Sequence, residues 1–211
     1  MNPIAERYYE ELYEAAAILN SARDPQEVLH ALVASVAKAM GAKGCSLLLL
    51  SPERKELWHT ASHGLSAAYV RKGPAWADRS ISESLEGKPV SILDAARDPR
   101  IQYGEEARKE GIVSILSAPM MLREEIIGVI RVYTAEPRQF GKEDVDFLEA
   151  AAHLGAIALE NARLYEAVKK DYESFRQEMR EWRAALGREW VAEKSVDPSE
   201  EENPEARLDA A

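Results

Sequence analysis

The sequence is poor in cysteine: Cys45 is the only one among 211 residues. A single thiol excludes an intramolecular disulfide, a zinc site built from several cysteines and a Cys-x-x-Cys redox pair. Because Cys45 lies in the apolar run GCSLLLL, we expect a buried structural thiol and not a nucleophile.

The sequence also lacks a basic surface and a long hydrophobic run. Its net charge of −10 argues against a nucleic-acid partner. No apolar run approaches the roughly 18 residues that a membrane span needs. The N-terminus, MNPIAERYYEEL, has an acidic helical pattern and does not resemble a signal peptide. We therefore expect a cytoplasmic protein with no membrane partner.

Acidic residues are concentrated in the last segment, residues 195–211. It holds six acids and one arginine, together with Pro198 and Pro204, and it has hardly any large apolar side chain. Such a segment cannot offset the entropy of ordering, so the composition predicts a disordered tail. An acidic docking peptide is the alternative.

Helical patterns stand at both ends of the remaining chain. Apolar residues three or four apart predict an amphipathic helix over residues 4–20. Asp24 and Pro25 are a cap and a first helical residue, and they predict a second helix that stops at Gly41. A third, long helix is predicted from Phe140 to about residue 194, which corresponds to on the order of 80 Å.

The long helix carries an apolar line over its distal half. Six steps from Leu164 to Leu186 average about 3.67 residues, which favours straight or slightly right-handed packing. A small domain cannot cover a helix of this length, so the distal half is expected to pair with a partner.

Strand patterns fill the middle of the chain. Apolar runs bounded by turn residues predict strands at 45–51, 56–64, 89–93, 111–122 and 125–134, and short helices at 66–71, 80–86 and 104–110. Pro119 within one run predicts an edge position or a bulge. The order predicts an α+β fold, with helices on one face of an antiparallel sheet and a loop-rich segment over the other. A small ligand is expected in the concavity beneath that segment.

Motifs for catalysis are weak throughout. Gly87-Lys88 does not complete a phosphate-binding loop, because Ser82 and Pro89 occupy two of its required positions. Asp94 and Asp98 suit turns better than an acid/base pair. The four histidines lack the spacing of metal ligands, no GxSxG elbow is present, and the sequence identifies no cofactor.

Aromatic and hydroxyl side chains are the better candidates for a binding site. An apolar cover over the sheet is the simpler explanation for each aromatic residue alone, but as a group they are candidate pocket walls. The predicted ligand-binding residues are Trp58, Trp76, Ile81, Tyr103, Ser114 and Ser117. Arg97 and Arg100 lie nearby in the sequence, and either would favour an anionic ligand if it faced the cavity.

Four segments in order resemble the GAF domain family. They are ASHGL (61–65), EGKPVSILDAARDPR (86–100), GIVSILSAPMMLREEIIGVIRVYT (111–134) and FGKEDVDFLEAAAHLGAIALENARLYE (140–166). The resemblance implies a central antiparallel sheet of about six strands, a small-molecule pocket under the loops of one face, and pairing through terminal helices.

The marks of several GAF subfamilies are missing from this sequence. Phe140 and Asp144 match part of the cyclic-nucleotide motif, but Val145 replaces its Glu and no Asn-Lys precedes it. Cys45 is followed by Ser46 and not by the His common in bilin attachment. One cysteine cannot supply both thiols of the methionine sulfoxide reductases of this fold.

These observations predict an N-terminal dimer helix (1–24), a GAF domain (25–165), a C-terminal signalling helix (166–194) and the acidic tail (195–211). The predicted function is a non-catalytic sensor that binds an unidentified small ligand, forms a homodimer through its terminal helices and acts on a separate signalling protein. The alternative is a module for dimerisation and protein interaction that binds no ligand.

Overall fold

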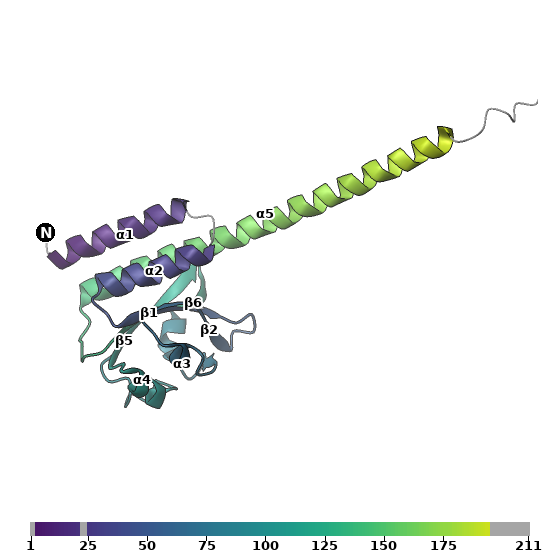
Figure 1. Ribbon diagram of the computed structural model, residues 1–211. Helices are drawn as coiled ribbons and strands as arrows, with labels where there is room; N and C mark the ends of the chain where they lie inside the picture. Colours follow the sequence, from purple (N-terminus) through teal and green to yellow (C-terminus); the bar gives the residue numbers. More distant parts are fainter. Residues whose placement is uncertain (1–2, 22–24, 195–211) are drawn as a thin grey trace, which may run out of the picture. The chain divides into compact units, whose positions relative to one another are not determined.

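Figure 1 shows the computed structural model, which describes residues 3–21 and 25–194. Its elements are α1 (Pro3–Ser21), α2 (Pro25–Ala39), β1 (Gly44–Leu50), β2 (Glu56–His63), α3 (Ala67–Val70), β3 (Ala75–Trp76), η1 (Ser82–Glu86), β4 (Val90–Ile92), α4 (Gly104–Glu110), β5 (Ser114–Leu122), β6 (Glu125–Thr134) and α5 (Lys142–Lys194). The chain divides into two compact units, Met1–Arg163 and Leu164–Ala211. The disorder predicted for 195–211 concerns residues outside the described part.

The strands form one antiparallel sheet in the order β3-β2-β1-β6-β5-β4. The predicted α+β class with about six strands is therefore confirmed. The pattern of the sequence did not predict β3, because two residues are too short to show a period.

At Pro119, β5 has a neighbouring strand on one side only. Pro119 is opposite Val129 of β6, whereas β4 pairs only with residues 115–117 of β5. A register shift follows between Met120 and Met121. The missing N–H of Pro119 therefore interrupts no β4 hydrogen bond, and the expectation of an edge position or bulge is confirmed.

Helices cover one face of the sheet (Figure 1). We call this side the helix face, and its core joins α2 and the first part of α5 to the strands. It is almost entirely aliphatic, with Val33, Leu47, Leu116, Ile130 and Leu148 among its buried residues. Close packing explains why a glycine lies within α5: a Cβ on Gly155 would stand 3.0 Å from Met120 Cε.

The loop-rich segment covers the other face. We call this side the cavity face, and α3, η1 and α4 contribute to its cover. Its core holds Tyr69, Ile81, Ile92, Ile115 and Tyr133. Because both faces are buried, β1 and β5 are apolar over most of their length and do not alternate with polar residues.

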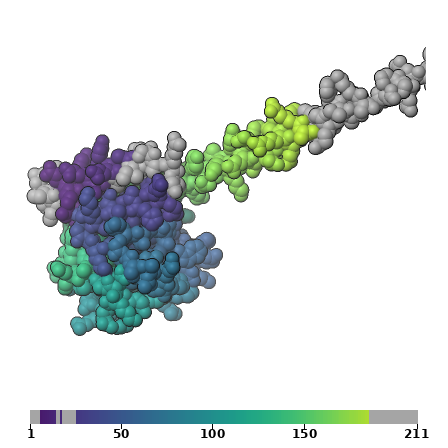
Figure 2. Space-filling view, viewed as in Figure 1, coloured from purple at the N-terminus to yellow at the C-terminus, as the bar shows by residue number. Residues whose placement is uncertain are grey.

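Helix α1 packs against α2 and the start of α5, as the space-filling view shows for α1 and α2 (Figure 2). The Tyr8 ring stacks on Phe147 with centroids 4.2 Å apart, and its hydroxyl donates to Asp144 Oδ1 at 2.6 Å. Arg138 donates to the same carboxylate at 2.7 Å. Asp144, which matches part of a cyclic-nucleotide motif, thus anchors α1.

The distal part of α5 forms the second unit together with residues outside the described range. Large apolar side chains stand exposed along it: Leu164, Tyr165, Val168, Tyr172, Phe175, Met179 and Trp182. This exposure agrees with the predicted apolar line.

Candidate functional site

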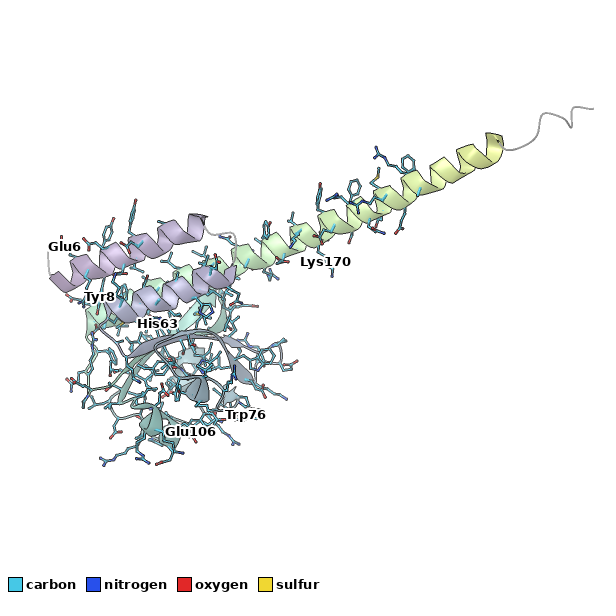
Figure 3. The ribbon with its side chains drawn as sticks, in the orientation of Figure 1. Glu6, Tyr8, His63, Trp76, Glu106 and Lys170 are labelled. Carbon is cyan, nitrogen blue, oxygen red and sulfur yellow. The ribbon has the colours of Figure 1, made fainter. Side chains whose placement is uncertain are left out.

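A narrow cavity lies between the sheet and its loop-rich cover. It has a volume of about 20 Å³, which is room for about one water molecule. Strand residues form its floor: Leu48, His59, Ile115, Arg131 and Tyr133. Ala75 of the edge strand β3 also lines it, and the cover contributes Tyr69, Lys72, Ser80, Ile101, Gln102 and Tyr103. Figure 3 labels Trp76 and Glu106, which lie on this side of the sheet, away from α1 and α2.

Arg131 lies at the centre of the cavity floor, where β6 places it between Ser46 of β1 and Ser117 of β5. Arg131 is 6% exposed. Nε donates to Ser117 Oγ at 3.4 Å, Nη1 to Ser80 Oγ at 3.0 Å and Nη2 to the Ser80 carbonyl at 2.7 Å. Burial lowers the pKa of Arg131, but an arginine stays charged at neutral pH. The guanidinium is therefore a buried cation bonded to neutral groups.

Lys72 follows α3 and reaches over the cavity from the cover. Its Nζ donates to the Tyr69 carbonyl at 3.0 Å and lies 3.4 Å from His59 Nε2. The same ammonium stands 3.8 Å from the centroid of the Tyr69 ring and 5.6 Å from that of Tyr103. Aromatic faces attract cations, so these two rings hold the ammonium in place.

The surroundings of Lys72 reduce its basicity. Burial, followed by the charge of Arg131, lowers the pKa of Lys72 to about 8. Glu106 and Glu110 of α4 act in the opposite direction. Lys72 therefore carries its charge at neutral pH but loses it under mildly alkaline conditions.

His59 on β2 is a neutral imidazole with one unpaired nitrogen. Burial, then Lys72 and Arg131, lower the pKa of His59 to about 3. An ammonium only donates, so Nε2 is the acceptor in the contact with Lys72 and the proton of the neutral ring is on Nδ1. Nδ1 is buried and finds no hydrogen-bond partner within the described residues. The cavity thus contains an N–H donor that lacks an acceptor.

A short strap, residues 73–76, closes the cavity. The Tyr103 hydroxyl and Gln102 Nε2 both donate to the Pro74 carbonyl, at 2.9 Å and 3.3 Å, and the Trp76 N–H donates to Gln102 Oε1 at 2.8 Å. Gly73 has a φ of 125°, and a Cβ there would lie 2.9 Å from the Tyr103 hydroxyl. Three hydrogen bonds therefore tie the strap to the segment before α4.

Two tyrosines complete the wall. The rings of Tyr69 and Tyr133 meet edge to face with centroids 6.0 Å apart, and the Tyr133 hydroxyl shares a 2.8 Å hydrogen bond with Ser46 Oγ. Burial raises the pKa of both phenols. They are neutral at physiological pH and add no negative charge to the cavity.

Two residues predicted from the sequence to bind a ligand lie at this cavity. Tyr103 is one of its lining residues, and Ser117 is buried beneath it and accepts from Arg131. Their contact with a ligand remains a prediction.

The other four predicted residues lie elsewhere. Trp58 on β2 is 51% exposed, and Trp76 lines a separate surface hollow with Arg54 and Lys55. Ile81 is packed in the core of the cavity face. Ser114 donates to the Leu93 carbonyl and accepts from the Arg138 N–H. The structure does not bring these four to the cavity that Tyr103 lines.

Arg97 and Arg100 are both outside the lining of the cavity. Arg100 binds both carboxylate oxygens of Asp98, at 2.9 Å and 2.7 Å, and Arg97 is 3.8 Å from Asp94. Each aspartate also accepts from the backbone N–H two residues further on. The predicted turn roles of Asp94 and Asp98 are confirmed.

Sequence reasoning missed the basic residues of the cavity. Arg131 is the one charge within the apolar stretch IIGVIRVYT, and a charge at such a position is the signal that could have identified it. His59 was interpreted as an ordinary histidine. Lys72 carries no local signal.

Other site types find little support in the described residues. They contain no group of three or more His, Cys, Asp or Glu side chains that could hold a metal ion. Cys45 is fully buried in the core of the helix face, where burial raises the pKa of its thiol. Across the same residues, every helix falls short of the length or hydrophobicity needed to cross a membrane.

Comparison with known proteins adds a family and several relatives. The model of the GAF domain matches residues 24–159. A methyl sulfide methyltransferase-associated sensor of Methanosarcina acetivorans is 27% identical over 139 residues, which is 63% of this chain and 14% of that protein. The chain thus corresponds to a small part of this relative.

Two solved structures share the fold. The GAF domain of a phosphoenolpyruvate-protein phosphotransferase from Coxiella burnetii superposes with a TM-score of 0.70 and 22% identity, over 79% of this chain and 99% of that one. The free methionine-R-sulfoxide reductase of Neisseria meningitidis, solved with its substrate, gives a TM-score of 0.67 and 19% identity over 78% and 95%. At these identities the likeness concerns the fold alone.

Proposed function

The chain belongs to the GAF domain family, and from that premise we propose that it is a non-catalytic sensor domain whose small ligand binds in the cavity. The observation that carries this proposal is the buried His59 Nδ1 at the cavity, which finds no hydrogen-bond partner among the described residues. Unpaired buried polar groups cost free energy, so a ligand that satisfied them would stabilise the folded chain. The sensor among its relatives supports the same conclusion.

We further propose that the signal passes to the helices through β6. Arg131 faces the cavity, whereas its neighbours Ile130 and Val132 are buried in the core of the helix face. A shift of β6 on ligand binding would therefore be felt by α2 and the start of α5. The ligand must bind one of two arrangements more tightly than the other for such a shift in population.

The output of this sensor would be a homodimer. Six exposed residues of α5 follow steps of three, four, three, four and three: Tyr165, Val168, Tyr172, Phe175, Met179 and Trp182. This is the heptad spacing of a left-handed coiled coil. The line counted from Leu164 favours straight or slightly right-handed packing. The line counted from Tyr165 favours a left-handed coiled coil instead. Exposed aromatic residues at this spacing favour a second copy of the helix as the partner, and a separate signalling protein would act on the pair.

The cysteine supports a non-catalytic role. The solved methionine sulfoxide reductase shows that this fold can support an enzyme. Here the one thiol, Cys45, is fully buried in the core of the helix face. A nucleophilic thiol needs access to substrate and a lowered pKa, and Cys45 has neither.

Ligand binding is tested by thermal unfolding of the full chain against a panel of neutral and charged metabolites. A compound that binds the cavity raises the unfolding temperature in a saturable way. The shift is expected to disappear in Ala75→Val, which fills part of the cavity. Retention of the shift in that variant would place the ligand elsewhere.

Dimerisation is tested by light scattering of Phe175→Glu, which puts a charge in the centre of the apolar line. The matched control is Ser174→Glu, which adds the same charge at a neighbouring exposed position outside the line. We expect the control to stay dimeric and Phe175→Glu to dissociate at concentrations at least about tenfold higher. Equal behaviour of the two variants would exclude α5 as the interface.

One observation favours the alternative of a ligand-free interaction module. The cavity of about 20 Å³ is smaller than most ligands, so the cover could serve only as packing. In that case no metabolite would change the unfolding temperature, whereas the dimer would still depend on Phe175.

A further inference from the structure

We propose that the ligand of this cavity is a small oxyanion or carboxylate, whose oxygen atoms accept hydrogen bonds from Arg131, Lys72 and His59. This inference rests on the proposed function, because it assigns a chemical class to the ligand of the same cavity.

The lining of the cavity has charge of one sign. Two of its twelve residues are cationic, His59 adds a ring N–H, and none of the twelve carries a carboxylate. The whole chain, by contrast, has 37 acidic residues and 27 lysines and arginines. A cavity that collects cations in an acidic protein requires an explanation, and a bound anion supplies one.

Arg131 is the strongest element of this argument. A buried guanidinium is normally paired with a carboxylate or phosphate, because an uncompensated buried charge is costly. Its hydrogen-bond partners are the neutral Ser80, Ser117 and Tyr133, and it takes part in no ion pair among the residues that the structure describes. A guanidinium carries five N–H donors; the contacts to Ser80 and Ser117 use three of them, and the Tyr133 hydroxyl is a further partner. The positive charge is left without a countercharge among the described residues, and an anion would supply it.

Lys72 and His59 add two donors from other elements. The Lys72 ammonium lies against the His59 ring, and both line the same cavity as Arg131. The Nδ1–H of His59 is buried without an acceptor in the described part of the chain. One oxyanion at this place would give an acceptor to His59 and countercharge to both cations.

The size of the cavity limits the ligand. About 20 Å³ admits a group near the size of one water molecule. A planar carboxylate or nitrate matches the planar fork of a guanidinium, but it is larger than one water molecule, so binding of the anion requires the strap to move. A carboxylate with a larger substituent would need the strap to release its hydrogen bonds to Gln102 and Tyr103.

A purely structural role for Arg131 is the competing explanation. Its two bonds to Ser80 attach the cover to the sheet, and a substitution that loosened the cover would impair binding of any ligand. Lys72 separates the two explanations, because its one contact with a strand is the 3.4 Å approach to His59 Nε2, whereas Arg131 makes both bonds that hold Ser80.

The experiment compares thermal unfolding of the full chain in sodium formate, acetate, pyruvate and nitrate at constant ionic strength. Formamide and acetamide serve as neutral counterparts, and chloride serves as a spherical anion. We expect at least one oxyanion to raise the unfolding temperature with a saturable midpoint, while its amide has no effect. Nitrate alone would indicate an inorganic ligand, and the carboxylates would indicate a metabolite.

Variants assign the effect to the cavity. Lys72→Met is expected to lower the affinity for the oxyanion by about tenfold or more, and Arg131→Met is expected to do the same. The matched control is Arg71→Met, which removes the same charge from the exposed neighbouring residue and should leave the affinity unchanged within about twofold. If Arg131→Met does not fold, the comparison of Lys72→Met with Arg71→Met still tests whether the anion binds at the cavity.

Three results would overturn the inference. They are the absence of any oxyanion effect, an equal effect of chloride, and equal losses in Lys72→Met and Arg71→Met. If neutral compounds of the larger panel still bind and lose binding in Ala75→Val, the sensor function stands with a neutral ligand. If nothing in either panel binds, the sensor function fails as well.

Discussion

The two faces of the sheet carry different kinds of side chain. The helix face packs Leu, Val, Ile and Ala from α2 and α5 onto the strands, with little polar content. The cavity face places a guanidinium, an ammonium, an imidazole and hydroxyl groups under a thin cover. Both faces belong to the same strands, so adjacent residues such as Leu116 and Ser117 serve opposite sides.

This difference separates stability from function. Aliphatic packing contributes free energy of folding without specifying a ligand. Buried cations contribute little or nothing to stability unless they are paired, which is why we propose that they serve to bind an anion. The comparison predicts that substitutions on the two faces have opposite consequences.

The largest effect is expected from the helix face. Leu116 on β5 is fully buried there. Leu116→Ala should lower the free energy of unfolding by about 2–5 kcal/mol, because it removes buried apolar surface and leaves a cavity. Urea unfolding measures this loss. A cost below about 1 kcal/mol would show that the helix face does not carry the stability.

Arg131→Met is expected to change stability much less. It removes the cost of a buried charge, which favours folding, but it leaves the Ser80 carbonyl without its donor, which costs about 1–3 kcal/mol. These effects oppose each other, so urea unfolding without added anion should shift by less than about 2 kcal/mol in either direction. A loss as large as that of Leu116→Ala would make Arg131 a structural residue.

The pH dependence of stability should show the titratable groups of the cavity face. The pKa of His59 is about 3 in the folded chain and 6.5 in the reference state, so the unfolded chain binds more protons between these values. Stability is then lost as pH falls through that window. The pKa of Lys72 is about 8 against 10.5, so stability rises with pH between 8 and 10.5.

Substitution of Lys72 tests the alkaline part of this pH dependence. The charges of Arg131, Glu106 and Glu110 also act on Lys72. Lys72→Met should therefore remove the rise above pH 8 in unfolding curves, and a bound anion should move it to higher pH. A rise that persists in Lys72→Met would have to come from another residue.

The smallest effect is expected at Trp58, a residue that the sequence predicts to bind the ligand. It is exposed, and its Nε1 donates to Glu56 at 2.9 Å on the surface of β2. Trp58→Ala should change stability by less than about 1 kcal/mol and leave the anion affinity unchanged. A loss of anion binding in the same thermal assay would show that Trp58 contributes to the binding site.

The fold could be read from the sequence because its signals are local. Apolar runs of strand length and the long periodic helix each reflect neighbours in the chain. Pro119 even indicated the part of β5 that has a neighbouring strand on one side only. The two-residue β3 was missed, because tertiary packing alone places it.

The cavity could not be read in this way. Its basic groups come from β2, the end of α3 and β6, and Tyr103 was the one predicted residue to reach its lining. Trp58 and Trp76 were reasonable wall candidates by residue type. Whether a strand residue faces a cavity or solvent depends on the cover above it, and no local pattern records that cover.

The sequence by itself determined the fold family, the order of the strands along the chain and the apolar line of α5, because periodicity and turn chemistry act over a few residues. The tertiary structure decided which charges share a cavity. Segments as distant as Lys72 and Arg131 come together only when the sheet closes and the cover folds over it, and burial then lowers the pKa values of His59 and Lys72. The site therefore depends on distance and desolvation, which exist only in the folded chain.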